Sequence, residues 1–274
     1  MNGPPDRVYV LGRDDTDSDA ASEATSPAGS DPVDSRPPHT ARVGAFLARD
    51  GSAGAPVGVD LDRPHAGVVF GKRGTGKSYT LGVLAEEIAD ARGVAPIVVD
   101  PMGVFGGLTA VGGRVVEPAV RPASIPPSTW PDLLGLDPAS GPGSLVWRVV
   151  ADAVDGGTET ESGAGAADAG GSAPSLAALR EAVAEADAPA ETRRAAANHL
   201  GLAASWGVFD ADAPPVASLA ADGDPVVIDL AGVLDAAAAA VLRAVARGLY
   251  DARVDGDLPR LPWLLVDEAH AFFD

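Results

Sequence analysis

The chain of 274 residues has no cysteine and only two lysines among its 20 basic residues. The absence of cysteine excludes disulfide bonds and zinc sites built from thiolates. The sequence also lacks an apolar N-terminal leader, and no apolar run approaches the roughly 18 residues that a membrane-spanning helix needs. We therefore expect a cytoplasmic protein that does not insert into a membrane.

Positive charge is scarce as well: 39 acidic residues oppose 20 basic ones, and the formal net charge is −19. No basic stripe is visible, which disfavours DNA binding over a broad face. An acidic surface with little lysine is typical of proteins from a high-salt cytoplasm, where abundant carboxylates maintain solubility. The alternative is an ordinary acidic protein from a GC-rich genome, since such genomes also favour alanine, glycine, arginine and aspartate.

The two lysines lie in one glycine-rich segment, residues 71–78, which reads G-x-x-x-x-G-K-S. This pattern is the phosphate-binding P-loop, in which backbone N–H groups surround the phosphates. Lys77 would contact the β- and γ-phosphates as a compact point charge, and the Ser78 hydroxyl would be a ligand of Mg²⁺. We therefore predict a site for ATP and Mg²⁺. The predicted nucleotide-binding residues are Gly71, Lys72, Arg73, Gly74, Thr75, Gly76, Lys77, Ser78 and Tyr79.

The flanks of this segment have the order that a P-loop requires. The apolar run at 66–70 predicts a buried strand before the loop, and apolar residues at helical spacing predict a helix at 79–92 after it. The phosphates would then lie at a helix N-terminus, where the helix dipole favours anions. A chance glycine-rich turn would not be expected to carry both flanking elements.

Apolar runs and helical patterns alternate along the rest of the chain. Strands are predicted at 95–100, 225–230 and 261–266, and helices at 176–185, 190–206 and 235–253, the last with Asp235 as its N-cap. Short strands are predicted at 8–11, 43–48 and 58–61, and short helices around 130–136 and 145–147. This alternation indicates an α/β fold with a parallel sheet and helices on both faces.

Composition divides the chain into two parts. Residues 1–57 form an N-terminal region of short strands with an acidic, disordered tract at 14–40. Residues 58–274 form the P-loop ATPase domain, which contains a mobile loop rich in glycine, alanine and serine at about 155–174.

The strand predicted at 261–266 ends in two acidic residues, Asp267 and Glu268. Open α/β sheets bind ligands at the carboxyl ends of their strands, and this segment has the Walker B pattern. Asp267 is predicted to hold Mg²⁺ through water, while Glu268 and Lys77 are the predicted catalytic residues, Glu268 by polarising the water that attacks the γ-phosphate. Two acids at a strand end are commonplace in so acidic a chain, so this prediction depends on the P-loop earlier in the same sheet. A glutamate in this position indicates the ASCE, RecA-like branch of P-loop NTPases.

Three further segments carry a family resemblance: residues 100–103, which read D-P-M-G, residues 226–230, and residues 264–272. Their order and spacing resemble the HerA-type ATPases of the HerA–FtsK superfamily, from about residue 58 to the end. The resemblance implies a homo-hexameric motor that moves DNA through a ring pore, with a nuclease as partner. Together with the acidic, lysine-poor composition it predicts a haloarchaeal source. It also implies that Lys77, Ser78, Asp267 and Glu268 carry the family's ATP and magnesium roles.

The chain departs from the family pattern in three places. Val104 replaces the glutamate of the D-P-x-G-E segment, and the N-terminal β-barrel typical of HerA is reduced to a few short strand candidates. Further core strands, a sensor residue and an arginine finger normally follow Walker B in this branch, but only six residues follow Glu268. We therefore expect a sheet that is incomplete at the C-terminus, in a truncated chain that hydrolyses ATP poorly.

Other classes fit the sequence less well. Residues 267–270 spell D-E-A-H, but in DEAH helicases this box follows the P-loop much sooner. The base-reading N-K-x-D motif of GTPases is impossible, because both lysines lie in the P-loop, and no L-S-G-G-Q stretch of ABC ATPases is present. A non-motor ATPase switch, or an inactive relative that assembles a partner complex, remains the alternative to a DNA motor.

Overall fold

The computed structural model describes residues 8–12, 39–155 and 173–272. The predicted disordered tract at 14–40 and the predicted mobile loop at 155–174 lie almost entirely outside the described residues. The part of the tract that is described, from His39 onward, leads into a strand.

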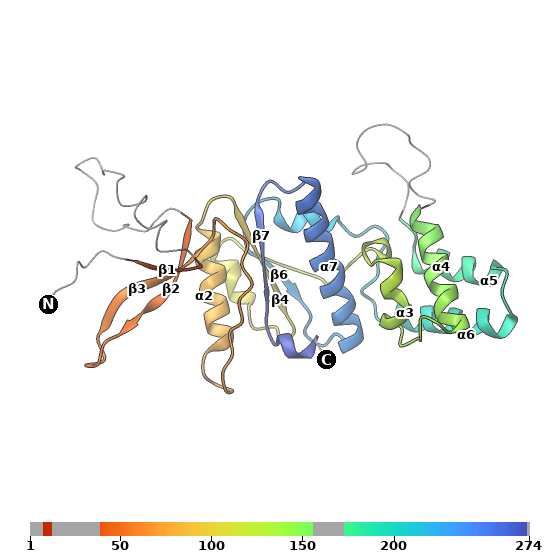
Figure 1. Ribbon diagram of the computed structural model, residues 1–274, viewed down its shortest axis with the longest axis horizontal. Helices are drawn as coiled ribbons and strands as arrows, with labels where there is room; N and C mark the ends of the chain where they lie inside the picture. Colours follow the sequence, from red (N-terminus) through yellow and green to blue (C-terminus); the bar gives the residue numbers. More distant parts are fainter. Residues whose placement is uncertain (1–7, 13–38, 156–172, 273–274) are drawn as a thin grey trace.

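A four-stranded parallel sheet forms the centre of the molecule (Figure 1). Its strands are β4 (Val94–Asp100), β5 (Arg114–Val116), β6 (Val226–Asp229) and β7 (Leu261–Val266), in the order β5-β6-β4-β7. Asp100 at the end of β4 is in register with Asp229 at the end of β6, and Val99 with Val266 of β7. The carboxyl ends of β4, β6 and β7 therefore meet at one edge, as predicted for a ligand-binding α/β sheet.

Six helices accompany this sheet in the described part of the chain (Figure 1). They are α2 (Lys77–Ala89), α3 (Trp130–Leu133), α4 (Gly141–Asp155), α5 (Leu176–Glu185), α6 (Ala190–Ala204) and α7 (Asp235–Asp255). Helices α5, α6 and α7 confirm the predicted helices, although α7 begins at Asp235 with Leu234 as its N-cap. The prediction of Asp235 as N-cap is therefore wrong by one position; its carboxylate lies in the first turn, where it still complements the helix dipole.

The sheet buries apolar side chains on both faces because helices cover both. Val98 of β4 belongs to a core cluster with Leu81 of α2. Its neighbours Ile97 and Val99 point to the opposite face and belong to the large core that includes Val241 of α7. This alternation along a fully buried strand confirms the predicted α/β class with helices on both faces.

Helices α3 to α6 form a separate group beside the sheet (Figure 1). The short helix predicted around 130–136 is the single turn α3, whereas the apolar residues at 145–147 belong to α4, a helix of 15 residues. Glycine and proline at the start of α4 obscured its length in the sequence. Its buried residues Leu145, Val146, Val149 and Val150 have the spacing of one helical face.

A second, smaller sheet precedes the P-loop. It contains β1 (Tyr9–Leu11), β2 (Thr40–Leu47) and β3 (Ala53–Asp60), with β3 in the middle, parallel to β1 and antiparallel to β2. These strands confirm the three short strand predictions before the P-loop. Helix α2 contacts β2 as well as β4, so the small sheet lies against the part of the molecule that contains the central sheet.

The strand predicted at 66–70 is wrong: this run is irregular and exposed. Val68 and Phe70 have exposed fractions of 84% and 89%. In the described part of the chain β7 is the edge strand of this sheet, and residues 66–70 do not pair with its open edge. An apolar run becomes a strand only when a neighbouring backbone accepts its hydrogen bonds, so the local sequence was insufficient here.

Candidate nucleotide site

The P-loop, residues 71–78, connects the irregular segment after β3 to helix α2. Gly74 and Gly76 have φ values of 80° and 90°, a left-handed conformation that glycine adopts at no steric cost. A Cβ atom on Gly71 would lie 2.5 Å from Thr75 Oγ1. Because the Thr75 hydroxyl donates a hydrogen bond of 2.7 Å to the Lys72 carbonyl, the loop closes tightly. The loop conformation therefore favours glycine at the two glycine positions of the motif, 71 and 76, and also at 74.

Helix α2 begins at Lys77 and presents an uncapped N-terminus to this loop. Its N-cap, Gly76, supplies no side-chain hydrogen bond, and the first turn holds no acidic residue. The first backbone N–H groups are therefore available to an anion, and the dipole favours negative charge at this end. Lys77 and Ser78 are half-buried here, whereas Lys72, Arg73 and Tyr79 are exposed.

The structure brings the two predicted motifs into contact although they are 189 residues apart. Ser78 Oγ donates to both carboxylate oxygens of Asp267, at 3.2 Å to Oδ1 and 3.0 Å to Oδ2. Asp267 is 4% exposed, and its backbone N–H donates to the Val99 carbonyl at 3.2 Å. The end of β7 therefore delivers this carboxylate to the start of α2.

The Ser78 and Asp267 oxygens are chemically suited to Mg²⁺. Magnesium prefers hard oxygen ligands, and it typically binds through one or two protein groups together with substrate phosphates and water. A hydroxyl and a carboxylate in direct contact fit this pattern. Among the described residues, no group of three or more histidine, cysteine or acidic side chains is arranged to hold a metal ion, here or at another place.

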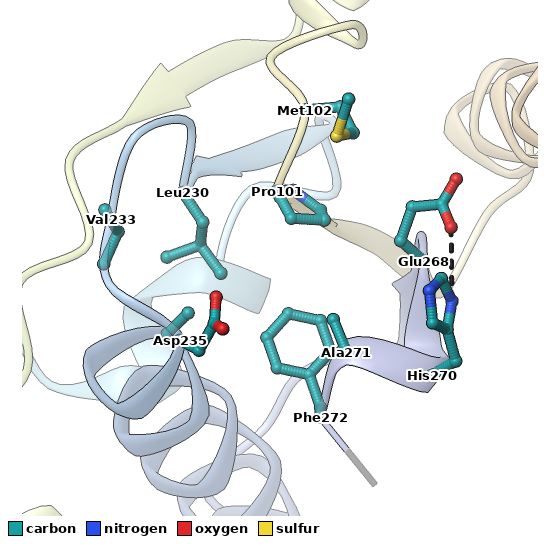
Figure 2. A pocket seen from close by; sticks show the side chains of 10 residues that line it. Pro101, Met102, Leu230, Val233, Asp235, Glu268, His270, Ala271 and Phe272 are labelled. Atoms are coloured by element: carbon teal, nitrogen blue, oxygen red, sulfur yellow. Dashed lines mark ion pairs between the residues drawn. The ribbon is translucent and has the colours of Figure 1, made fainter.

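Glu268 lies at the border of a cavity of about 260 Å³ at the carboxyl ends of the strands (Figure 2). Its other walls include Pro101 and Met102 after β4, Leu230 after β6 and Asp235 at the start of α7, with Phe272 after β7. The Glu268 carboxylate forms an ion pair with His270, with 3.2 Å between Oε2 and Nδ1. The structure thus places the two acids after β7 differently: Asp267 contacts the P-loop, and Glu268 contacts His270.

Asp100, at the end of β4, organises the turn that follows the strand. Its side chain is 1% exposed and accepts hydrogen bonds from two backbone N–H groups, Met102 at 3.2 Å and Phe105 at 2.8 Å. Phe105 is thereby held in the core cluster that contains Leu81 of α2. Val104, which replaces the family glutamate, is exposed in the same turn.

We expect Asp100→Ala to destabilise the protein by about 2–4 kcal/mol, because two backbone N–H groups lose their acceptor in a buried site. Asp229→Ala is the matched control, since Asp229 lies beside Asp100 in the sheet and its side chain accepts a single hydrogen bond within the described residues, from Ala231 N at 2.9 Å. Its expected cost is about 1 kcal/mol. Urea unfolding of both variants measures the difference, and equal stabilities would contradict this role.

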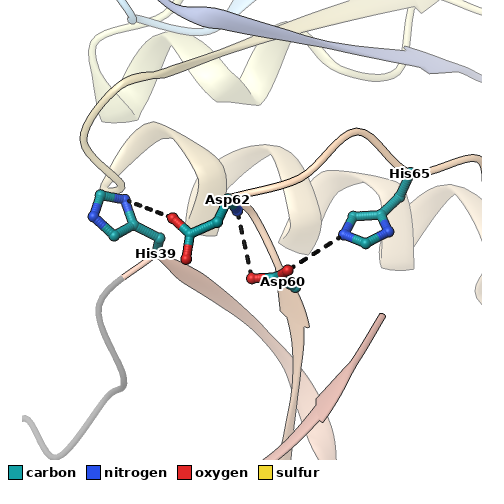
Figure 3. Close-up of polar contacts among 4 residues, drawn as sticks. All are labelled: His39, Asp60, Asp62 and His65. Carbon is teal, nitrogen blue, oxygen red and sulfur yellow. Dashed lines mark hydrogen bonds and ion pairs between the residues drawn. The ribbon is translucent and has the colours of Figure 1, made fainter. Parts of the chain in front are cut away.

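Two histidines that the sequence did not distinguish fix the approach to the P-loop (Figure 3). His65 Nε2 lies 3.7 Å from Oδ2 of the buried Asp60, and His39 Nδ1 lies 3.5 Å from Asp62 Oδ1. The His65 ring also lies 6.0 Å from the ring of Trp263 in β7. These contacts link the end of β3 to the central sheet. Local sequence offered no sign of them, because they depend on how the two sheets meet.

The parallel sheet, the P-loop before α2 and the acidic residues after β7 together define a P-loop ATPase domain. Residues 41–249 match the family described as "Helicase HerA, central domain", and the chain belongs to this family. That match ends before β7, so the placement of Asp267 beside Ser78 is independent of it.

The structure of VirB4 of Thermoanaerobacter pseudethanolicus is similar, with a TM-score of 0.55 and 16% sequence identity. The similarity covers 73% of this chain and 82% of that one, and at this identity it concerns the fold alone. No curated protein matches the chain. Within the described residues, no helix has the length and apolar character needed to cross a lipid bilayer.

Proposed function

We propose that this domain binds ATP with Mg²⁺ and hydrolyses it, and that hydrolysis drives a cytoplasmic, HerA-type DNA translocase. The contact between Ser78 and Asp267 carries the proposal, because it joins the phosphate-binding loop to the carboxylate that follows β7. The contact places a hydroxyl oxygen and a carboxylate, both groups that Mg²⁺ accepts as ligands, at the start of α2.

The P-loop residues have distinct roles in this proposal. Backbone N–H groups of residues 71–79 surround the phosphates, and Lys77 contacts the β- and γ-phosphate oxygens as a compact point charge. Ser78 and Asp267 would hold Mg²⁺, with Asp267 acting through water. When bound, the magnesium offsets negative charge on the phosphate oxygens.

Glu268 activates water in the hydrolytic step. The water oxygen forms a bond to the γ-phosphorus as the bond to the β–γ bridging oxygen breaks, and Glu268 accepts the proton that the water loses. The products are ADP and inorganic phosphate. Lys77 stabilises the negative charge that develops on the transferred group.

Membership of the HerA family, rather than surface charge, supports DNA as the proposed object that is moved. The net charge of −19 opposes broad contact with DNA, but a few arginines from each subunit of a homo-hexameric ring would suffice in a pore. Concentrated salt weakens phosphate contacts by counterion release, so a protein of high-salt cytoplasm would depend on few of them. A nuclease that processes DNA ends is the partner we propose.

The test is DNA-stimulated ATPase activity in concentrated KCl, measured on the protein expressed from its whole reading frame. We expect duplex or single-stranded DNA to raise the rate of phosphate release severalfold, and Lys77→Ala to abolish the basal and the stimulated rate. If ATP is hydrolysed but no DNA stimulates it, a non-motor ATPase switch that assembles a partner complex becomes the better account.

A further inference from the structure

Glu268 has a backbone conformation that is unfavourable for its residue type. It is left-handed, with φ 46° and ψ 41°, and His39 is the only other non-glycine residue with positive φ in the described part of the chain. Such conformations are disfavoured by the Cβ atom and are concentrated at functional sites. Two backbone hydrogen bonds hold the turn, from Ala271 N to Glu268 O at 2.8 Å and from Phe272 N to Ala269 O at 3.1 Å.

This turn brings the side chains of Glu268 and His270 together (Figure 2). His270 Nδ1 lies 3.2 Å from Oε2 of Glu268. Among the described residues, no hydrogen bond or ion pair reaches the other carboxylate oxygen, Oε1. One oxygen of the carboxylate is therefore held, and the other remains able to accept a proton.

Because the Glu268–His270 pair is exposed, its effect would be on the orientation of the Glu268 carboxylate rather than on the stability of the fold. The His270 side chain is 81% exposed and that of Glu268 is 33% exposed, and ion pairs this accessible contribute little to folding. Pro101, Leu230 and Phe272 line the cavity with apolar side chains, and Asp235 of α7 is the other acidic residue that lines it. In the described part of the chain, His270 is the side chain that forms a polar contact with the Glu268 carboxylate.

We propose that His270 is a positioning residue for ATP hydrolysis: its Nδ1 holds Oε2 of Glu268 and so directs Oε1 toward the attacking water. The inference rests on the proposed function of Glu268. His270 gains and loses no proton in the step; it restricts the rotation of a flexible side chain before the water is activated. Misorientation of a general base reduces the rate of the chemical step without weakening nucleotide binding.

The test compares three substitutions of His270 in the protein expressed from its whole reading frame. Asn carries its amide nitrogen on Cγ, as histidine carries Nδ1, whereas the Gln nitrogen is one atom further along and corresponds to Nε2. We expect His270→Ala and His270→Gln to lower kcat about 5- to 20-fold with KM for ATP unchanged. His270→Asn should restore kcat to within about threefold of the unsubstituted protein.

Two results would overturn the positioning role: full activity in His270→Ala, or equal loss in all three variants, which would indicate a merely structural contribution. Glu268→Gln separates this inference from the proposed function. If Glu268→Gln hydrolyses ATP normally, the proposed role of Glu268 fails first. If Glu268→Gln is inactive and His270→Ala is fully active, only the positioning inference fails.

A spectroscopic measurement tests the contact between Glu268 and His270 without measuring ATP hydrolysis. In ¹⁵N-histidine-labelled protein, Glu268→Gln should move the Nδ1 resonance of His270 and leave the resonances of His39, His65 and His199 in place. An unchanged His270 resonance would show that the pair does not form, and the inference would then be wrong whatever the rate of hydrolysis.

Discussion

Substitution of Lys77 by alanine is expected to weaken ATP binding by at least about 100-fold, because the phosphates lose charge-assisted contacts worth about 1.5–3 kcal/mol each. Lys77→Arg should also bind ATP weakly. A planar guanidinium keeps the charge but is too large and too rigid to replace a compact ammonium group inside the loop. Titration with a fluorescent ATP analogue in concentrated KCl measures both affinities.

Lys72→Ala is the matched control for this loss, since it removes the only other lysine from the same loop. Lys72 is exposed, and its recorded hydrogen bonds use the backbone carbonyl, which accepts from Thr75. We expect the Lys72→Ala protein to bind ATP with an affinity less than about threefold below that of the unsubstituted protein. Equal losses for the two lysines would show that net charge, rather than a specific contact of Lys77, governs binding.

Glu268→Gln is expected to retain ATP affinity and to lose hydrolysis by a factor of about 10²–10⁴, the range contributed by a general base. The substitution preserves the size of the side chain and leaves Asp267 and Ser78 in contact. Phosphate release and nucleotide binding are measured on the same preparation of the protein expressed from its whole reading frame. The decisive pattern is an unchanged dissociation constant with a reduced kcat.

The control for this variant is Glu181→Gln, on the surface of α5 and far from the P-loop in the sequence. It makes the same chemical change in charge, and we expect its kcat to equal that of the unsubstituted protein. Normal turnover by Glu268→Gln would show that another group activates water, and the acid after Walker B would have no catalytic role.

Elements that depend on local sequence were predicted closely. Helix α5 has the predicted bounds, 176–185, because Ser175 caps it by accepting a hydrogen bond from Ala178 N at 3.1 Å. Its buried residues Leu176, Leu179 and Val183 have helical spacing. Strands β4, β6 and β7 were predicted for a related reason: each is a short apolar run that ends in a turn. In these cases residues close together in the sequence supply both the signal that ends the element and its apolar pattern.

Elements that depend on distant partners were predicted less well. The run at 66–70 has the composition of a buried strand but lies exposed, because no backbone in the described part of the chain pairs with it. The extent of α4 was missed, since its first turn contains glycine and proline while its stability comes from packing against α3, α5 and α6. The carboxylate of Asp100 was noted only as a family match, and its two buried hydrogen bonds became visible in the structure alone.

The sequence by itself determined which groups are available for chemistry: the P-loop with the only two lysines, the hydroxyl of Ser78, and the acids Asp267 and Glu268. It also determined the α/β class, because apolar periodicity is a local property of the chain. Only the tertiary structure decided which of these groups meet. Parallel pairing of β7 with β4 places Asp267 against Ser78 across 189 residues, and the left-handed turn at Glu268 directs the second acid to His270 instead.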